Sequence, residues 1–144
     1  MNTKSLPGWT TKIDEISNGV FKVTLTDKLG RKAEAVDFAT DETIDKTLSY
    51  AFDIEKKVST NWNKFLFDFC LLRLTDKTIT KESYKDKDFG SWLIEVGDKR
   101  LLYLGKESWL VSQTQSDKKW FDNFIIKDNE LTYDTVSLFL KHIS

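Results

Sequence analysis

The chain has 144 residues, with 22 lysines and arginines against 23 aspartates and glutamates and a formal net charge of −1. This length fits a single domain over residues 1–144, and the 40% apolar and 31% charged residues are typical of a globular protein, not of a disordered or fibrous one. The balanced charge argues against a nucleic-acid partner, because such proteins carry a basic excess that faces the phosphates.

The first third of the chain predicts a β-meander. Three β-rich runs, Trp9 to Ile16, Val20 to Thr26 and Arg31 to Val36, are separated by short segments that end in Gly19 and Gly30.

The register of the first hairpin can be predicted from burial. A three-residue loop at Ser17 to Gly19 pairs Ile16 with Val20 and Ile13 with Val23. One face of the sheet then carries the apolar residues Trp9, Ile13, Phe21, Val23 and Leu25. A two-residue Asn-Gly turn would instead mix charged residues into this face, so we predict the three-residue loop.

A long helical segment follows the meander. Thr40 is the predicted N-cap, because its hydroxyl precedes Asp41 and Glu42, where the helix dipole favours negative charge. Apolar side chains then recur at three- and four-residue spacing, at Ile44, Leu48, Ala51, Val58, Trp62, Phe65, Phe69 and Leu72. The opposite, solvated face is predicted to carry Glu42, Asp45, Ser49, Asp53 and Lys56.

Residues 61–74, NWNKFLFDFCLLRL, are apolar on all sides, which is typical of a helix buried between layers. The alternation of Phe65, Phe67 and Phe69 also allows a strand. The absence of Val, Ile and Thr favours the helix, and a break near residues 59–61 is left open.

The rest of the chain predicts a second meander after a charged connector, Thr75 to Gly90. The expected strands are Ser91 to Val96, Arg100 to Leu104, Ser108 to Gln113 and Trp120 to Ile126, and a short helix is expected over residues 132–143. The sequence therefore predicts an α+β fold in which antiparallel β-meanders pack against a long central helix or helix pair, with a short C-terminal helix.

Side chains suited to catalysis or metal binding are scarce. Cys70 is the only thiol and His142 the only imidazole, and the apolar flanks of Cys70 favour a small buried side chain over a nucleophile. One Cys and one His cannot form a tetrahedral zinc site within one chain, and residues 86–90, DKDFG, lack the downstream glutamate of a calcium loop. We therefore predict no catalytic residue, no metal and no cofactor.

The compartment can be predicted from two further observations. A single cysteine cannot form a disulfide within the chain, so an oxidising compartment is not required. No stretch approaches the roughly 20 uncharged apolar residues of a membrane span, and the N-terminus has no signal-peptide pattern. We expect a cytoplasmic protein.

The second meander carries large apolar residues on both faces, for example Trp92 and Ile94 on one and Leu93 on the other. Such a sheet is either covered on both faces or exposes an apolar patch. Because aromatic residues beside charged ones are enriched at interface centres, we place a candidate partner-binding site at Tyr84, Asp86, Asp88, Trp109, Trp120 and Phe121. The alternative for each tryptophan is burial in the core.

The segment GWTTKIDEISNGVFKVTLTDKLGRKAE, with the acid-started helix after it, resembles small bacterial toxin-immunity proteins over about the first 58 residues. The resemblance implies a non-enzymatic protein that occludes a toxin or effector domain, and it implies no particular site residues. The alternative hypothesis is a small-ligand-binding or hydrolytic α+β roll with an apolar pocket. Both a monomer and a homodimer are compatible with the sequence.

Overall fold

The computed structural model describes residues 5–74 and 76–143. The chain forms two compact units, one over residues 3–60 and one that begins at Asn61. Each unit has its own antiparallel sheet and at least one helix, which confirms the α+β class. That residues 1–144 behave as one domain stays a prediction. Within the described residues, no helix combines the length and the apolarity that a membrane span needs.

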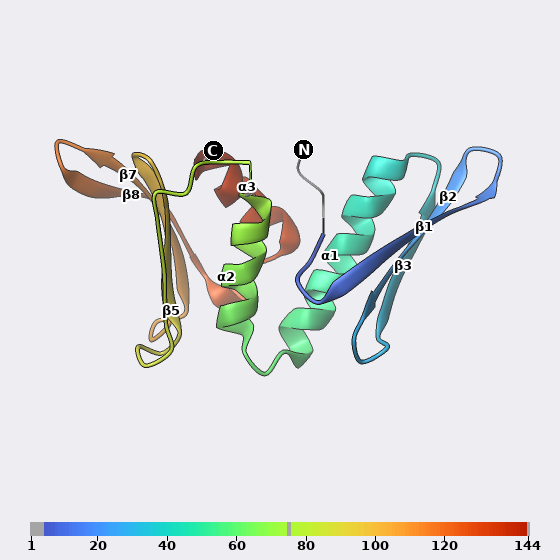
Figure 1. Cartoon of the computed structure of the whole chain (residues 1–144), viewed down its shortest axis with the longest axis horizontal. Helices are drawn as coiled ribbons and strands as arrows, with labels where there is room; N and C mark the ends of the chain where they lie inside the picture. The colour runs from blue at the N-terminus through green and yellow to red at the C-terminus, as the bar shows by residue number, and fades with distance from the viewer. Residues whose placement is uncertain (1–4, 75, 144) are drawn as a thin grey trace. The chain divides into compact units, whose positions relative to one another are not determined.

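The first unit is a three-stranded meander with one helix (Figure 1). Its strands β1 (Trp9–Ser17), β2 (Val20–Asp27) and β3 (Lys32–Asp37) pair in the order β1-β2-β3, and α1 (Thr40–Val58) packs against β2 and β3. The Trp9 indole N–H donates a 3.0 Å hydrogen bond to Glu55 Oε1, which ties the start of β1 to α1. The buried apolar residues of the first unit include Trp9, Val23, Leu25, Ala33, Ala35, Leu48, Ala51 and Phe52.

The first hairpin has the predicted Ile13–Val23 pair but a different turn. Ser17, not Ile16, pairs with Val20 around a two-residue Asn-Gly turn, so the three-residue loop was wrong. A bulge between Glu15 and Ser17 inserts Ile16 and restores the register that burial of the apolar face demands.

The burial predicted for β1 was also wrong at Ile13, which is 46% exposed although it lies on the apolar face. The reason is that β1 is an edge strand, whereas α1 packs against β2 and β3.

The N-cap of α1 lies one residue before the predicted Thr40. Ala39 has extended backbone angles, and its carbonyl accepts both the Thr43 N–H at 3.0 Å and the Thr43 hydroxyl at 2.6 Å. Thr47 is likewise buried and donates its hydroxyl to the Thr43 carbonyl. The apolar stripe is therefore shifted, and Val58, predicted to be in the core, is 43% exposed.

Replacing Ala39 with serine should stabilise α1 by about 0.5–2 kcal/mol, because a serine hydroxyl can accept a hydrogen bond from an unpaired N–H of the first turn. Thr40→Ala should leave stability nearly unchanged, since Ala39 and not Thr40 is the cap. Urea unfolding followed by helical circular dichroism measures both. A larger loss for Thr40→Ala than the gain for Ala39→Ser would contradict the cap position.

The second unit contains a five-stranded sheet with two helices on one side of it (Figure 1). The helix α2 (Trp62–Arg73) confirms the helical interpretation of residues 61–74, and Asn61 caps it by accepting a hydrogen bond from Lys64 N–H. The remaining elements, in chain order, are β4 (Lys81–Lys85), β5 (Ser91–Val96), β6 (Lys99–Leu104), β7 (Trp109–Ser116), β8 (Lys119–Lys127), a short 3-10 turn (Asp128–Glu130) and α3 (Tyr133–Ile143). The strands pair in the order β4-β5-β6-β7-β8, all antiparallel.

The strand β4 lies within the segment Thr75 to Gly90, which was predicted to be a charged connector, so that prediction was wrong for residues 81–85. Thr75, the first residue of the predicted connector, lies outside the described residues. The sequence KESYK has no apolar alternation. It becomes a strand because it pairs with β5, with Tyr84 opposite Trp92 on the face that α2 covers.

The covered face of the sheet is built around Trp92 and Tyr103, which stack with ring centroids 5.8 Å apart. Phe67 of α2 lies 5.5 Å from Trp92. Asp128 accepts a 2.7 Å hydrogen bond from the Trp62 indole and also hydrogen-bonds the Tyr103 side chain. Burial raises the pKa of Tyr103, and the Asp128 charge acts in the same direction. These contacts join α2, β6 and the 3-10 turn, and they fix which face of the sheet the helices of the second unit cover.

Candidate functional site

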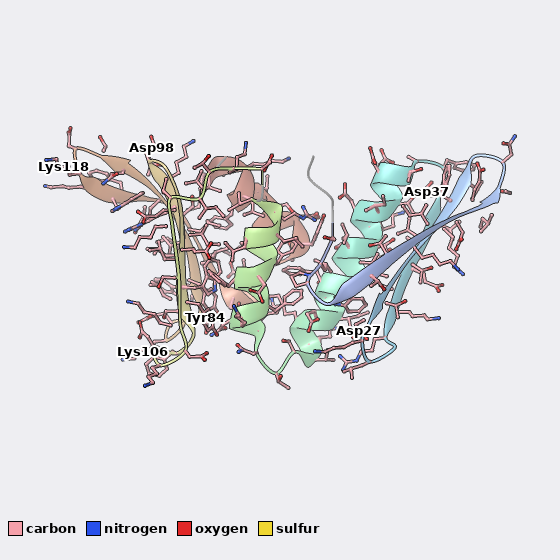
Figure 2. All side chains as sticks on the ribbon, in the orientation of Figure 1. Asp27, Asp37, Tyr84, Asp98, Lys106 and Lys118 are labelled. Carbon is pink, nitrogen blue, oxygen red and sulfur yellow. The ribbon has the colours of Figure 1, made fainter. Side chains whose placement is uncertain are left out.

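The face of the β4–β8 sheet opposite α2 and α3 is called the outer face. Because side chains alternate along each strand and Trp92 lies on the covered face, the cross-strand register assigns the outer positions. Side chains project from this side of the sheet in Figure 2. One outer row is apolar and contains Leu93, Leu102, Val111 and Ile125; the next is polar and contains Glu95, Arg100, Gln113 and Asp122.

The polar row forms a connected network across β5 to β8. Arg100 Nε donates a 2.7 Å hydrogen bond to Gln113 Oε1, and Gln113 Nε2 donates a 2.6 Å bond to Asp122 Oδ1. The Arg100 guanidinium lies 4.0 Å from Glu95 Oε1 and 4.0 Å from the ring centroid of Trp120. Burial lowers the pKa of Arg100, while Glu95 and Asp122 oppose that shift, so the guanidinium stays charged.

This network positions Arg100 and Trp120 before any partner arrives. An arginine held at Nε and stacked on an indole has already lost most of its rotamer freedom, so little further entropy is lost on binding. Arg and Trp are the side chains that most often supply binding energy at interface centres.

The apolar row extends this surface. Leu104 pairs with Trp109 at the next outer position; Leu104 is 36% exposed, Ile125 is 49% exposed and Trp109 is half-buried. Apolar residues next to an ordered polar network are typical of the centre and rim of a protein interface.

Two of the six predicted binding residues, Trp109 and Trp120, lie on the outer face, but the structure does not bring them together: Trp109 begins β7, whereas Trp120 pairs with Gln115 near the other end of that strand. Tyr84 lies on the covered side (Figure 2), 5.6 Å from Phe67, and its hydroxyl donates to Asn61 Oδ1. Phe121 points to the opposite side from its neighbour Trp120 and is 53% exposed.

The other two predicted residues, Asp86 and Asp88, lie in the exposed turn after β4. Asp88 also lines a hollow in the outer face, described further below. The binding role of all six residues stays a prediction.

Sequence reasoning missed Arg100, Gln113 and Asp122. Alternation along β6 places Arg100 on the same face as Leu102, and this was visible in the sequence. The pairing of Gln113 with Asp122 could not be predicted from the sequence, because a register shift follows Ser112 in the β7–β8 pair.

Comparison with known proteins adds no relative. No family model matches the chain, and no curated protein or solved structure matches it significantly. The argument for a function therefore rests on the geometry of the described residues.

The side chains considered for catalysis have other structural roles. Cys70 is completely buried in α2, and burial raises the pKa of its thiol, against a smaller opposing effect of Arg73. The His142 ring is exposed on α3 with its centroid 4.3 Å from that of Phe124. Across residues 5–74 and 76–143, no three His, Cys, Asp or Glu side chains are arranged as metal ligands would be.

Cys70 should resist alkylation in the folded protein. Because its raised pKa keeps the thiol protonated at pH 8 and its side chain is buried, iodoacetamide should react about 100-fold or more slowly than with the urea-unfolded chain. Mass spectrometry of timed samples measures the two rates. Similar rates in both states would show that Cys70 is an accessible thiolate and reopen nucleophilic chemistry.

Proposed function

We propose that this chain is a non-enzymatic, cytoplasmic protein-binding module, an immunity-type protein that neutralises a bacterial toxin or effector domain by occluding it. The observation that carries the proposal is the outer face of the β4–β8 sheet. Trp109, Trp120 and a fixed Arg100 lie there beside exposed apolar side chains, and the second unit covers only the other face.

The state of the candidate nucleophile also supports binding over catalysis. Cys70 is buried with a raised pKa, which is the opposite of what an activated thiol requires. The carboxylates on the outer face, Glu95 and Asp122, lie in a network with Arg100, which suits orientation of a partner better than proton transfer.

Affinity capture tests the proposal. The tagged 144-residue chain is incubated with lysate of the cell that encodes it, in low and in high salt, and the retained proteins are identified by mass spectrometry. We expect one partner in equimolar amount whose expression alone arrests growth. Retention of no specific protein, together with a co-purifying small molecule, would overturn the proposal.

A second candidate function is binding of a small apolar ligand, because a hollow of about 310 Å³ lies between β8 and α3. Its walls are mostly apolar and contain Phe124, Ile126, Leu138 and Phe139, with Glu130 and His142 also lining it. This volume is at the lower end of the roughly 300–1,000 Å³ of small-molecule sites. Native mass spectrometry of the purified chain would reveal a retained ligand.

A further inference from the structure

A second hollow, of about 280 Å³, lies within the outer face itself, where β4, β5 and β6 run side by side. Leu93, Leu102 and Leu104 line it. The small side chains of Ser83 and Ser91 are the outer residues next to these leucines, and their size explains why the sheet surface is depressed at this point.

The charged side chains that line this hollow are Lys81 and Lys85 of β4 and Asp88 of the following turn. Both lysines are exposed, and neither forms an ion pair with any side chain in the described part of the chain. Glu95, the cross-strand neighbour of Lys81, lies 4.0 Å from the Arg100 guanidinium, so Lys81, Lys85 and Arg100 stand against Glu95 and Asp88 and the rim keeps an excess of positive charge. An anionic group is therefore its electrostatic complement.

We propose that this hollow receives one apolar side chain of the partner protein, from a segment in which carboxylates flank that side chain. The inference rests on the proposed function and names the chemistry of the partner. The apolar floor of Leu93, Leu102 and Leu104 suits an apolar side chain, and the charged rim suits the carboxylates beside it.

Continuity with the rest of the outer face supports a protein partner. Leu104, which lines the hollow, is the cross-strand neighbour of Trp109. A partner segment that contacts Trp109 therefore reaches the hollow with its next residues. Interface hot spots are typically side chains that fill such pockets on the other protein.

The proposal also gives the sign of the partner's charge. Unpaired lysines at the hollow attract an acidic segment and repel the basic, nucleic-acid-binding cleft of a nuclease. We therefore expect the hollow to contact an acidic region of the toxin.

Short blocked peptides test the inference on the isotope-labelled 144-residue chain. The probes are acetyl-Asp-Leu-Asp-amide, acetyl-Lys-Leu-Lys-amide and acetyl-Asp-Ala-Asp-amide, with hexanoate as a small free acid, each titrated to millimolar concentration. We expect the acidic leucine peptide to shift the amide resonances of Ser83, Leu93 and Leu102. It should bind about threefold or more tightly than each of the other two peptides.

Charge variants provide the matched comparison. The double variant Lys81→Gln, Lys85→Gln should lower the affinity for the acidic leucine peptide by about threefold or more. The double variant Lys99→Gln, Lys119→Gln changes the net charge by the same amount, but both residues lie on the opposite face of the sheet. It should leave the affinity for this peptide unchanged.

Three results would overturn the inference. These are no shifts at the hollow, equal binding of the basic peptide, or tighter binding of hexanoate than of the acidic leucine peptide, which would make this a small-acid site. The peptide titration tests only the hollow. The proposed function is tested by capture of the partner, so failure of one can be distinguished from failure of the other.

Discussion

Gly105→Ala should lower the free energy of unfolding by about 3 kcal/mol, the upper end of the usual range for overpacking. A Cβ atom at Gly105 would lie 2.1 Å from the Phe89 carbonyl oxygen and 3.1 Å from the Ser91 nitrogen. These obstacles are backbone atoms, which cannot rotate away as a side chain can. The Phe89 carbonyl also accepts a 2.9 Å hydrogen bond from Asn63 Nδ2, so a shift of the turn would disturb the start of α2.

The control for this prediction is Gly97→Ala in the β5–β6 turn. Gly97 has a positive φ of +64° but nothing within 4 Å of an added Cβ. Gly97→Ala should therefore lower the free energy of unfolding only by the backbone strain, about 1–2 kcal/mol. Guanidinium unfolding of both variants measures the difference. Equal losses in the two variants would mean that the turn at Phe89 does not lie against Gly105.

Trp120→Ala should weaken binding of the captured partner by about 2 kcal/mol or more, which is roughly a 30-fold loss of affinity. The indole lies on the outer face and stacks on Arg100, so its removal deletes contact area and frees the guanidinium. Isothermal titration calorimetry with the purified partner measures the change.

Phe121→Ala, at the other predicted binding residue of β8, separates an interface on the outer face from one that includes the opposite face. Both residues are large aromatics of β8 and neighbours in sequence, but they point to opposite sides of the sheet, and Phe121 is 53% exposed. Its loss should change affinity by less than about threefold. Circular dichroism checks that both variants fold. A larger effect of Phe121→Ala would place the interface on the covered side of the sheet.

The strands and helices that sequence alone predicts are those with a strong local pattern. The meander of β1 to β3 and the strands β5 to β8 follow from β-rich runs between turn residues, and α2 follows from the absence of β-branched side chains. The strand β4 has no such pattern, because KESYK becomes a strand only through pairing with residues about ten positions further along the chain. The bulge at Ile16 restores the Ile13–Val23 pair that burial had predicted, whereas the predicted pair of Ile16 with Val20 does not form.

The candidate site was only partly predictable for a similar reason. Alternation shows that Trp92 and Leu93 lie on opposite faces, but which face is covered depends on where α2 and α3 pack. Trp109 and Trp120 could be named from their residue type. Tyr84 could not be separated from them by sequence, because its position on the covered face depends on pairing with Trp92.

Titration of the captured partner's toxic activity with the purified chain tests the central claim most directly. If the chain neutralises its partner by occlusion, activity should fall in proportion to added chain and reach zero near an equimolar ratio, whereas Trp120→Ala should need a large excess. Full activity at a molar excess of the unmodified chain would contradict the account.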